Sequence, residues 1–479
     1  MLDLANPANA TNVHDEYFAH GRTPRAAYAR LAQSLATFAP EELASGVRAI
    51  NATLLRRGVT FTVYAETAGT ERIFPFDPIP RIFTAEQWAV VAGGVAQRVR
   101  ALNAFLHDVY HEGRILREKR VPREMVESSS LYVREMIDVN VPHGVYVHVS
   151  GIDLIWDDGG RPMVLEDNVR TPSGISYVLE NRDVLKRTFP RLFEGYRIRP
   201  VDDYPLRLLR ALQEAAPPDV DHPSVIVLTP GVYNSAYYEH AMLARHMGVP
   251  LAEGRDLIIV DNVVYLRTTR GLERVDVIYR RVDDDFLDPL YFRADSVLGV
   301  AGLMNAYRAG TVTLANAIGT GIADDKALYR YVPEMIRFYL GEEPLLPNVE
   351  TYDCTEPSAR RHVIDNLADF VVKRTNGSGG YGMLIGPSSS AAERAEFARR
   401  IEADPRSYIA QPVVQLSSHP TLVNGQLAPR RIDLRPFVLH GREIDVPPAA
   451  LTRVALREGS LVVNSSQGGG SKDTWVLGA

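Results

Sequence analysis

The sequence predicts an α/β fold with more than one domain, and three patterns lead to this prediction. Residues 152–156 and 162–168 are two short apolar runs on either side of the turn sequence DDGG, as in a β-hairpin. Residues 225–260 alternate strand, helix and strand, the order of a Rossmann-like unit. Residues 370–385 place a glycine-rich loop between two apolar strands. A chain of 479 residues has room for about two to four domains.

The N-terminal part of the chain shows a different pattern from these α/β segments. Residues 1–130 are predicted to be mainly helical, with 84–110 as one long amphipathic helix. No motif in this region indicates chemistry. We therefore expect a helical region that precedes the domains carrying the site.

The amino-acid composition indicates which class of binding partner to expect. The formal charge of −6 and the pI near 6.1 provide no broad cationic field for nucleic acid or an anionic membrane, so we expect a small-molecule partner. Cys354 is the single cysteine, which excludes an intramolecular disulfide. The chain contains no uninterrupted apolar span of about 18 to 20 residues and no leader-like N-terminus, so we expect no membrane contact and a cytoplasmic protein.

The predicted hairpin carries the first candidate site. Side chains on a strand alternate between its two faces, so Glu166 and Asn168 share one face while Asp167 points to the other. Asp153 lies on the partner strand. Magnesium prefers hard oxygen ligands, and Asp153, Glu166 and Asn168 supply them. A solvated polar face is the better explanation for an isolated Glu-x-Asn pair. The choice between a metal site and a solvated face therefore depends on the neighbouring motifs.

Lysine usage provides an independent indication. Only five of the 53 basic residues are lysine, so lysine remains where a compact ammonium differs from a guanidinium. Lys373 ends an apolar strand just before the loop that contains Gly377, Gly379 and Gly380, a pattern suited to holding phosphates. This loop leads into a strand rather than a helix, which argues against a dinucleotide fingerprint.

Two further lysines have alternative explanations. Lys326 follows a Gly-Thr-Gly turn at the start of a predicted helix and is either a phosphate ligand or a helix-surface residue. Lys472 lies near the C-terminus after a run of glycines. It is either a phosphate or acyl-phosphate ligand on a mobile loop or part of a disordered tail.

Two C-terminal strands complete the candidate site. Residues 407–416 are predicted to form a strand between lobes, whose backbone at Gln411, Pro412 and Val413 meets the adenine edge. Residues 431–438 alternate polar and apolar side chains, which is usually a solvated face. In a functional interpretation, Arg435 or Arg453 is a cation near the γ-phosphate in the transition state.

In this order the motifs resemble the circularly permuted ATP-grasp family (type 2), related to the synthetase domain of glutathionylspermidine synthase. The resemblance extends from about residue 130 to the C-terminus and includes a substrate loop after the hairpin. It implies Mg²⁺ and ATP as cofactors, and ligation of a small-molecule or peptide carboxylate to an amine through an acyl-phosphate. Many unpermuted members have an arginine two residues before the hairpin aspartate, where this chain has Gly151. The implied substrate-binding residues are Arg170, Thr171, Ser173, Gly174 and Arg281.

The resemblance also implies a domain order. The expected fold has α+β lobes, a Rossmann-like pre-ATP-grasp subdomain and the helical N-terminal region. The expected units after residue 130 are the metal-binding part of the large lobe (131–215), the Rossmann-like subdomain (216–318), the nucleotide-binding small lobe (319–405) and the rest of the large lobe with a C-terminal loop (406–479).

The sequence is also compatible with other functions and with other roles for several residues. A small-molecule kinase uses the same clamp with a hydroxyl acceptor, and a nucleotide-binding protein without turnover is a third possibility. The acidic run 283–285 with Asp288 either binds the amine or serves helix capping and solubility, and capping is the better explanation. His143 and His148 are expected to be structural.

Overall fold

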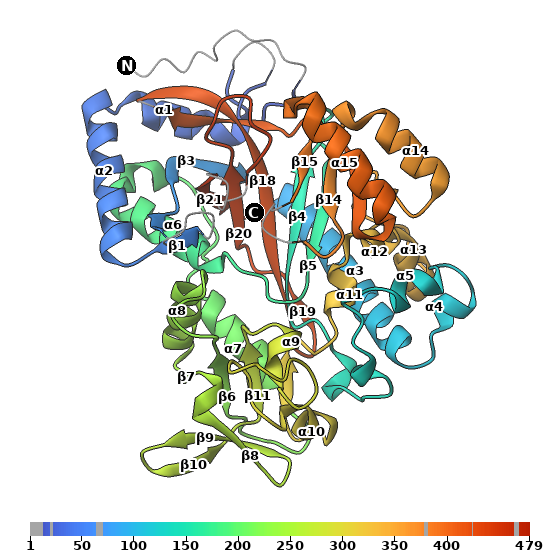
Figure 1. The fold of residues 1–479 in the computed structure, drawn as a ribbon. Coiled ribbons are helices and arrows are strands. Elements are labelled where there is room, and N and C mark those ends of the chain that lie inside the picture. Colours follow the sequence, from blue (N-terminus) through green and yellow to red (C-terminus); the bar gives the residue numbers. More distant parts are fainter. Residues whose placement is uncertain (1–12, 20–22, 64–69, 378–381, 424, 464–468) are drawn as a thin grey trace.

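The computed structural model describes residues 13–19, 23–63, 70–377, 382–423, 425–463 and 469–479. Its centre is an eight-stranded sheet with the order β3-β21-β20-β18-β4-β5, to which β17 and β19 add by pairing with β18 (Figure 1). These strands are β3 (Phe76–Phe83), β4 (Val149–Trp156), β5 (Pro162–Asn168), β17 (Ser418–Val423), β18 (Gln426–His440), β19 (Ile444–Asp445), β20 (Ala450–Val454) and β21 (Gly470–Val476).

The predicted hairpin is confirmed as β4 and β5. Asp153 lies opposite Glu166, and Gly151 lies opposite Asn168, with an irregularity in the pairing after Asp153. The long 15-residue strand β18 pairs with the other edge of β4, so the hairpin is built into the central sheet. Segments nearly 300 residues apart therefore meet at one sheet face.

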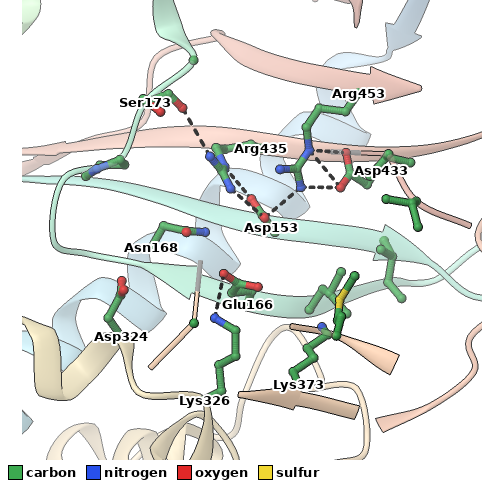
Figure 2. A pocket seen from close by; sticks show the side chains of 18 of the residues that line it. Asp153, Glu166, Asn168, Ser173, Asp324, Lys326, Lys373, Asp433, Arg435 and Arg453 are labelled. Atoms are coloured by element: carbon green, nitrogen blue, oxygen red, sulfur yellow. Dashed lines mark hydrogen bonds and ion pairs between the residues drawn. The ribbon is translucent and has the colours of Figure 1, made fainter. Parts of the chain in front are cut away.

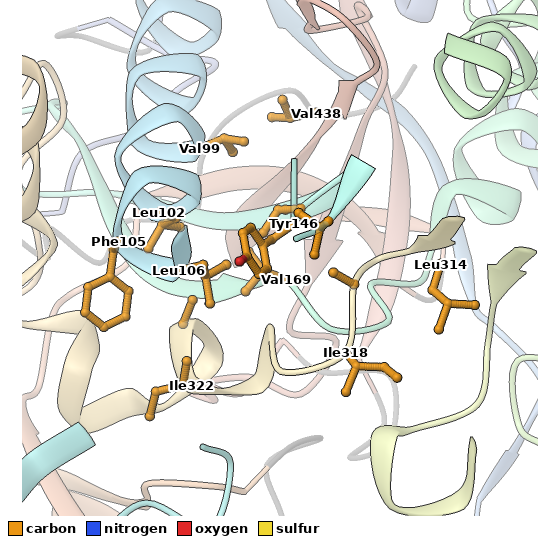
Figure 3. Close-up of a cluster of buried hydrophobic side chains, with 14 of the residues drawn as sticks. Val99, Leu102, Phe105, Leu106, Tyr146, Val169, Leu314, Ile318, Ile322 and Val438 are labelled. Carbon is orange, nitrogen blue, oxygen red and sulfur yellow. The ribbon is translucent and has the colours of Figure 1, made fainter. Parts of the chain in front are cut away.

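The long N-terminal helix is also confirmed, as α3 (Ala85–Tyr110). Thr84 and Gln87 form a reciprocal capping box that fixes where it begins. Its apolar residues pack into the largest hydrophobic core, where Figure 3 shows Leu102 and Leu106 close to Tyr146 and Val169. The helix therefore supports the sheet from the side of the hairpin.

The prediction of a separate helical N-terminal region is only partly right. Besides helices, this region contains β3, which pairs in parallel with β21 and so belongs to the central sheet. The strands β1 (Thr60–Val63) and β2 (Thr70–Ile73) pair with each other in a separate antiparallel two-stranded sheet. The amphipathic pattern of 84–110 dominates the sequence of this region. The strand β3 pairs with a segment near the C-terminus, and no pattern in the neighbouring sequence indicates such a distant partner. The helices here are α1 (Ala29–Ala36), α2 (Pro40–Arg56), α4 (Arg114–Arg117) and α5 (Arg123–Glu127).

The predicted Rossmann-like subdomain is a four-stranded parallel sheet with the order β12-β11-β6-β7. It lies beyond the end of the central sheet, in green and yellow in Figure 1. Its strands are β6 (Val225–Leu228), β7 (Leu251–Ala252), β11 (Val277–Arg280) and β12 (Thr313–Ala315), and its helices include α7 (Tyr204–Glu214), α8 (Tyr237–Met247), α9 (Asp284–Leu287) and α10 (Leu303–Arg308).

The sequence-based prediction assigned one strand of this subdomain to the wrong sheet. The apolar run 257–260 is β8 (Leu257–Val260), and it belongs to a separate antiparallel sheet with β9 (Val263–Thr268) and β10 (Gly271–Arg274). Asp261 and Asn262 both have positive φ, 50° and 60°, as a tight two-residue hairpin turn requires. That turn sends the chain back beside β8, and the short β7 takes the expected place in the parallel sheet.

The small lobe holds a second sheet next to the hairpin. Its order is β13-β16-β14-β15, with strands β13 (Tyr352–Asp353), β14 (Phe370–Arg374), β15 (Leu384–Ile385) and β16 (Tyr408–Pro412). Because β16 pairs with β14 throughout, the lobe continues beyond the predicted boundary at residue 405. The remaining helices are α6 (Ile175–Thr188), α11 (Gly321–Asp324), α12 (Lys326–Tyr329), α13 (Val332–Met335), α14 (Pro357–Asp365) and α15 (Ala391–Ala403). None of the helices in the described ranges is both long enough and apolar enough to cross a membrane.

Asp167 confirms the predicted hairpin register. Its carboxylate accepts two hydrogen bonds from Arg98 of α3, at 2.6 and 2.7 Å, on the face away from Glu166 and Asn168. Both side chains of this pair are 2% exposed. Asp167 is thus a buried structural anion that ties the hairpin to α3.

We predict that Asp167→Asn destabilises the fold by about 3–5 kcal/mol, because the Arg98 guanidinium loses its anion inside the core. The change in unfolding free energy is measured by urea denaturation. Asp295→Asn is the matched control, since its pair with Arg293 is exposed, and we expect a change within about 0.5 kcal/mol. Equal effects of the two substitutions would contradict the buried ion pair.

Candidate active site

One cavity of about 610 Å³ lies where the central sheet, the small lobe and the Rossmann-like subdomain meet. It is lined by polar residues from β4, β5, β18 and β20, by the small-lobe strands β14 and β16, and by the start of α8. Figure 2 shows the part of the cavity around the hairpin. The predicted site residues that line it are Asp153, Glu166, Asn168, Arg170, Thr171, Ser173, Gly174, Arg281, Lys326, Lys373, Gly377, Gln411, Pro412, Val413, Arg435 and Arg453. Gly379 and Gly380 lie outside the described residues.

A cluster of two arginines and two aspartates, in which only Arg435 is partly exposed, forms one wall of the cavity. Arg435 donates two hydrogen bonds to Asp153, at 2.6 and 2.8 Å, and Arg453 donates one at 2.8 Å. Arg453 also pairs with Asp433. The polar alternation on β18 is therefore not a solvated face, because Asp433 is fully buried and its neighbour Arg435 lines the cavity.

The charges of this cluster favour the ionised forms of Asp153 and Arg453. Burial alone would raise the pKa of Asp153, but Arg435 and Arg453 hold it well below its ordinary value. Burial raises the pKa of Asp433 in spite of Arg453, and Asp153 adds to the rise. Burial would lower the pKa of Arg453, whereas Asp153 and Asp433 raise it. Asp153 thus stays a carboxylate between two guanidinium groups.

The side chain of Arg435 lies against Gly151, the position at which many unpermuted relatives are expected to have an arginine. A Cβ atom added to Gly151 would lie 2.9 Å from Cδ and 3.1 Å from Cγ of Arg435. A side chain at 151 would therefore displace Arg435.

Two lysines form the opposite wall, next to the small lobe (Figure 2). Lys326 donates a hydrogen bond of 3.1 Å to Oε1 of Glu166, and Lys373 donates one of 2.7 Å to Oε1 of Gln411. Burial would raise the pKa of Glu166, but Lys326 and Lys373 lower it. Burial lowers the pKa of Lys373 to about 8, and the Lys326 cation adds to this shift. Lys326 keeps a raised pKa because Glu166 and Asp324 outweigh its burial.

The donor set on the hairpin suits a hard cation such as Mg²⁺. Glu166 and Asn168 line the cavity from the same strand face. Within the described part of the chain, Nδ2 of Asn168 is buried without a hydrogen-bond partner, so protein contacts do not fix this amide. A carboxylate has about four lone-pair positions, and three on Asp153 accept from arginines. Asp153 therefore has only one position left for a metal.

The prediction for Lys472 is wrong. The residue lies in strand β21, not on a mobile loop, and its side chain is fully buried. Its ammonium pairs with Asp77 and donates to the carbonyls of Ile79 and Pro420. It does not line the cavity. A lysine after a glycine run looks exposed in sequence, but β21 is an inner strand between β3 and β20.

The other polar candidates are mostly structural, as expected. Asp288 accepts from the backbone of Leu290, Gly302 and Met304, which is a capping role, and Asp284 pairs with Arg280. The pKa of His148 falls to about 4 because the ring is buried, and Nδ1 lies 3.0 Å from the His440 carbonyl. His143 contacts the carbonyl of Ala216. Of the acidic run, Asp283 lines the cavity.

Sequence reasoning missed two acids that position the substrate loop 170–174. Asp324 of α11 accepts from the Arg170 side chain at 2.8 Å. Glu239 of α8 accepts from the backbone of Gly174 and Ser176, at 2.8 and 2.9 Å. Both acids line the cavity. A buried glutamate in a helix whose partner lies 65 residues away leaves no local signal.

The comparisons with known proteins agree with this architecture. The family described as circularly permuted ATP-grasp type 2 matches residues 80–455. The chain belongs to this family. An uncharacterized protein of Synechocystis sp. is 55% identical over 97% of both chains, and one from Mycobacterium tuberculosis is 53% identical over 97% of this chain and 84% of the relative.

Two other relatives bear on the class of reaction and the fold. A Frankia alni protein provisionally named glutamate–cysteine ligase is 44% identical over 99% of this chain, which spans only 54% of that protein. The solved apo structure of a glutathione synthetase-like effector from Globodera pallida matches with a TM-score of 0.57, 11% identity and coverage of 92% and 98%. This likeness confirms the fold. Family membership, together with the Frankia relative, supports an ATP-dependent ligase.

The pKa of Lys373 predicts how nucleotide binding depends on pH. Below pH 8 the ammonium is charged and attracts phosphate, and above pH 8 it becomes neutral. The affinity for an ATP analogue with Mg²⁺ should fall as pH rises through 8, approaching about tenfold per pH unit. Calorimetric titration between pH 7 and 9.5 measures this. Lys373→Arg stays charged and should remove the inflection, so identical profiles for both proteins would contradict the assignment.

Proposed function

We propose that this protein is an ATP-dependent ligase that joins a carboxylate to an amine through an acyl-phosphate. The observation that carries the proposal is the composition of one cavity. A lysine pair, an acid–amide pair and an arginine that contacts the substrate loop all line it. These are the groups that phosphoryl transfer to a bound carboxylate requires.

The nucleotide would lie along the small lobe. Lys326 and Lys373 would contact its phosphates, each as a compact point charge. Gln411, Pro412 and Val413 line the same cavity from the end of β16, and the backbone there would meet the adenine edge. Gly377 belongs to the same wall, just after β14.

Glu166 and Asn168 would hold Mg²⁺, with the one remaining position on Asp153 as a third contact. When bound, the metal would neutralise negative charge on the nucleotide phosphates. Glu166 would then contact the metal in place of part of its present contact with Lys326. The lysine would thereby become available to a phosphate oxygen.

The two arginines are proposed to have different roles. Arg453 is engaged by both Asp433 and Asp153, so we assign it the positioning of Asp153. Arg435 has Nη1 3.3 Å from the Ser173 carbonyl, a weak contact at the substrate loop. We assign Arg435 to the negative charge that develops on the transferred phosphoryl group.

The chemistry has two steps. A carboxylate oxygen of the acid attacks the γ-phosphorus, the bond to the β,γ-bridging oxygen breaks, and ADP leaves. The amine nitrogen then attacks the carbonyl carbon, the bond between that carbon and the phosphate oxygen breaks, and the nitrogen loses a proton. Splitting one difficult condensation into two easier displacements is the reason for the intermediate.

A small-molecule kinase is the second candidate, because a hydroxyl acceptor fits the same clamp. A nucleotide-binding protein without turnover is less well supported, because Glu166 and Asn168 both line the cavity. Small-molecule or peptide substrates are expected in either enzymatic case.

We predict that Glu166→Gln and Asn168→Ala each reduce ADP formation by at least about a hundredfold, because the developing charge loses its metal contact. ADP release is measured with a coupled assay on variants whose unfolding midpoints match the wild type. Asp158→Asn, in the exposed turn of the same hairpin, is the control and should keep full activity. Full activity in Glu166→Gln would exclude the metal assignment.

Oxygen labelling separates a ligase from a kinase. With an accepted acid labelled with ¹⁸O in its carboxylate, the ligase transfers one labelled oxygen to inorganic phosphate, together with ADP and an amide product. Mass spectrometry of the phosphate measures this transfer. A stable phosphorylated product with no released phosphate would establish the kinase instead, and unlabelled phosphate alone would indicate simple hydrolysis.

A further inference from the structure

The cavity has a second end, formed by the Rossmann-like subdomain. Glu239 and Arg281 line this end, together with residues 234–236 that lead into α8. The loop 170–174 connects it to the arginine cluster, since Arg435 contacts the carbonyl of Ser173 and Arg281 contacts that of Thr171. The lysines proposed to bind phosphate lie on α12 and β14, and the residues proposed to hold the metal lie on β5.

Arg281 is buried at the cavity wall with spare hydrogen-bonding capacity. It is 5% exposed. Two of its five donors are used, one by the Tyr279 hydroxyl at 3.0 Å and one by the Thr171 carbonyl at 3.3 Å. Within the described ranges, its Nε is buried and donates to no acceptor. A buried guanidinium donor on a cavity wall calls for an anionic oxygen from a ligand.

Glu239 has a complementary spare acceptor. Its Oε2 accepts from the backbone of Gly174 and from the backbone and hydroxyl of Ser176, which fixes the start of α6. Its Oε1 is buried and accepts no hydrogen bond from any residue the structure describes. The side chain is 3% exposed. An ammonium group would satisfy this acceptor.

The two spare groups are close together. Oε1 of Glu239 lies 3.5 Å from Nη2 of Arg281, close enough for an ion pair but too long for a good hydrogen bond. An α-amino acid carries an ammonium and a carboxylate on one carbon atom, at the same close spacing and with the opposite charges. His240 adds no charge here, because burial and the Arg281 cation keep its pKa well below the ordinary value.

The geometry points to a subsite for a zwitterionic α-amino acid, with Arg281 binding its carboxylate and Glu239 its ammonium. This inference rests on the proposed ligase function, and it names the chemical class of one of the two substrates. A simple amine would leave Nε of Arg281 unsatisfied, and a simple acid would leave Oε1 of Glu239 unsatisfied. The subsite therefore selects ligands that carry both an ammonium and a carboxylate, because any other ligand leaves one of these buried groups without a hydrogen bond.

The test is direct binding to the nucleotide-free full-length protein. The probes are the twenty standard amino acids, each compared with its α-carboxamide and its N-acetyl derivative, by ligand-observed NMR. At least one free amino acid should bind, and each derivative should bind more weakly by about tenfold or more, since each lacks one charged partner. No binding of any amino acid at millimolar concentration, or equal binding of the derivatives, would overturn the subsite.

Two variants test which side chain binds the ammonium and which binds the carboxylate of the ligand. Glu239→Gln keeps an oxygen acceptor for Gly174 and Ser176 but removes the charge, so it should abolish discrimination against the N-acetyl derivative only. Arg281→Gln should abolish discrimination against the carboxamide only. Glu273→Gln, a partly exposed position on β10 in the same part of the chain, is the matched control and should behave as wild type. Equal losses for all ligands in both variants would indicate a purely structural role.

The outcome is independent of ligase activity. Amino-acid binding with the predicted selectivity, without ADP formation with any acid, would retain the subsite and remove the proposed function. ADP and amide formation with amines that lack a carboxylate, without amino-acid binding, would retain the ligase and remove the subsite.

Discussion

The Asp153 carboxylate, held between Arg435 and Arg453, is the interaction on which the rest of the site depends. It joins β4 to β18 and β20, and with Asp433 it forms a cluster of two acids and two arginines in which only Arg435 is partly exposed. Removal of any member would leave an uncompensated charge in the core. The cluster thereby fixes the hairpin face, and with it the direction in which Glu166 and Asn168 point.

The same cluster connects the two ends of the cavity. Arg435 extends from it to the substrate loop, whose other contacts are the Asp324 pair with Arg170 and the Arg281 bond to Thr171. The loop is therefore anchored by the central sheet, by α11 and by the Rossmann-like subdomain. In the proposed function, a substrate at Arg281 and a phosphate at Lys326 would be coupled through this one short segment.

The sequence predicted those features that depend on local pattern. The hairpin, the α3 helix and the face shared by Glu166 and Asn168 follow from strand and helix periodicity, and the structure confirms them. The low number of lysines drew attention to Lys326 and Lys373, and both line the cavity, while their contact with a nucleotide stays a prediction. The same argument failed for Lys472, because the ion pair that buries it involves Asp77, almost 400 residues earlier.

Apart from the local β8–β9 turn, the features that escaped prediction depend on contacts between distant segments. The strand β3 has no local mark of its pairing with β21, and Glu239 resembles any helix glutamate until α6 lies beside it. Gly151 appeared to lack a cation, yet Arg435 fills the space above it from a strand almost 300 residues later. Periodicity indicates which face a side chain occupies, but not which segment packs against that face.

A crystal structure with a non-hydrolysable ATP analogue and Mn²⁺, whose anomalous scattering locates the metal, tests the central claim most directly. We predict an anomalous peak bound by Glu166 and Asn168, with the β- and γ-phosphates between that peak and Lys326 and Lys373, and with the pair between Asp153 and Arg435 intact. A nucleotide bound elsewhere, or a metal held without Glu166 and Asn168, would contradict it.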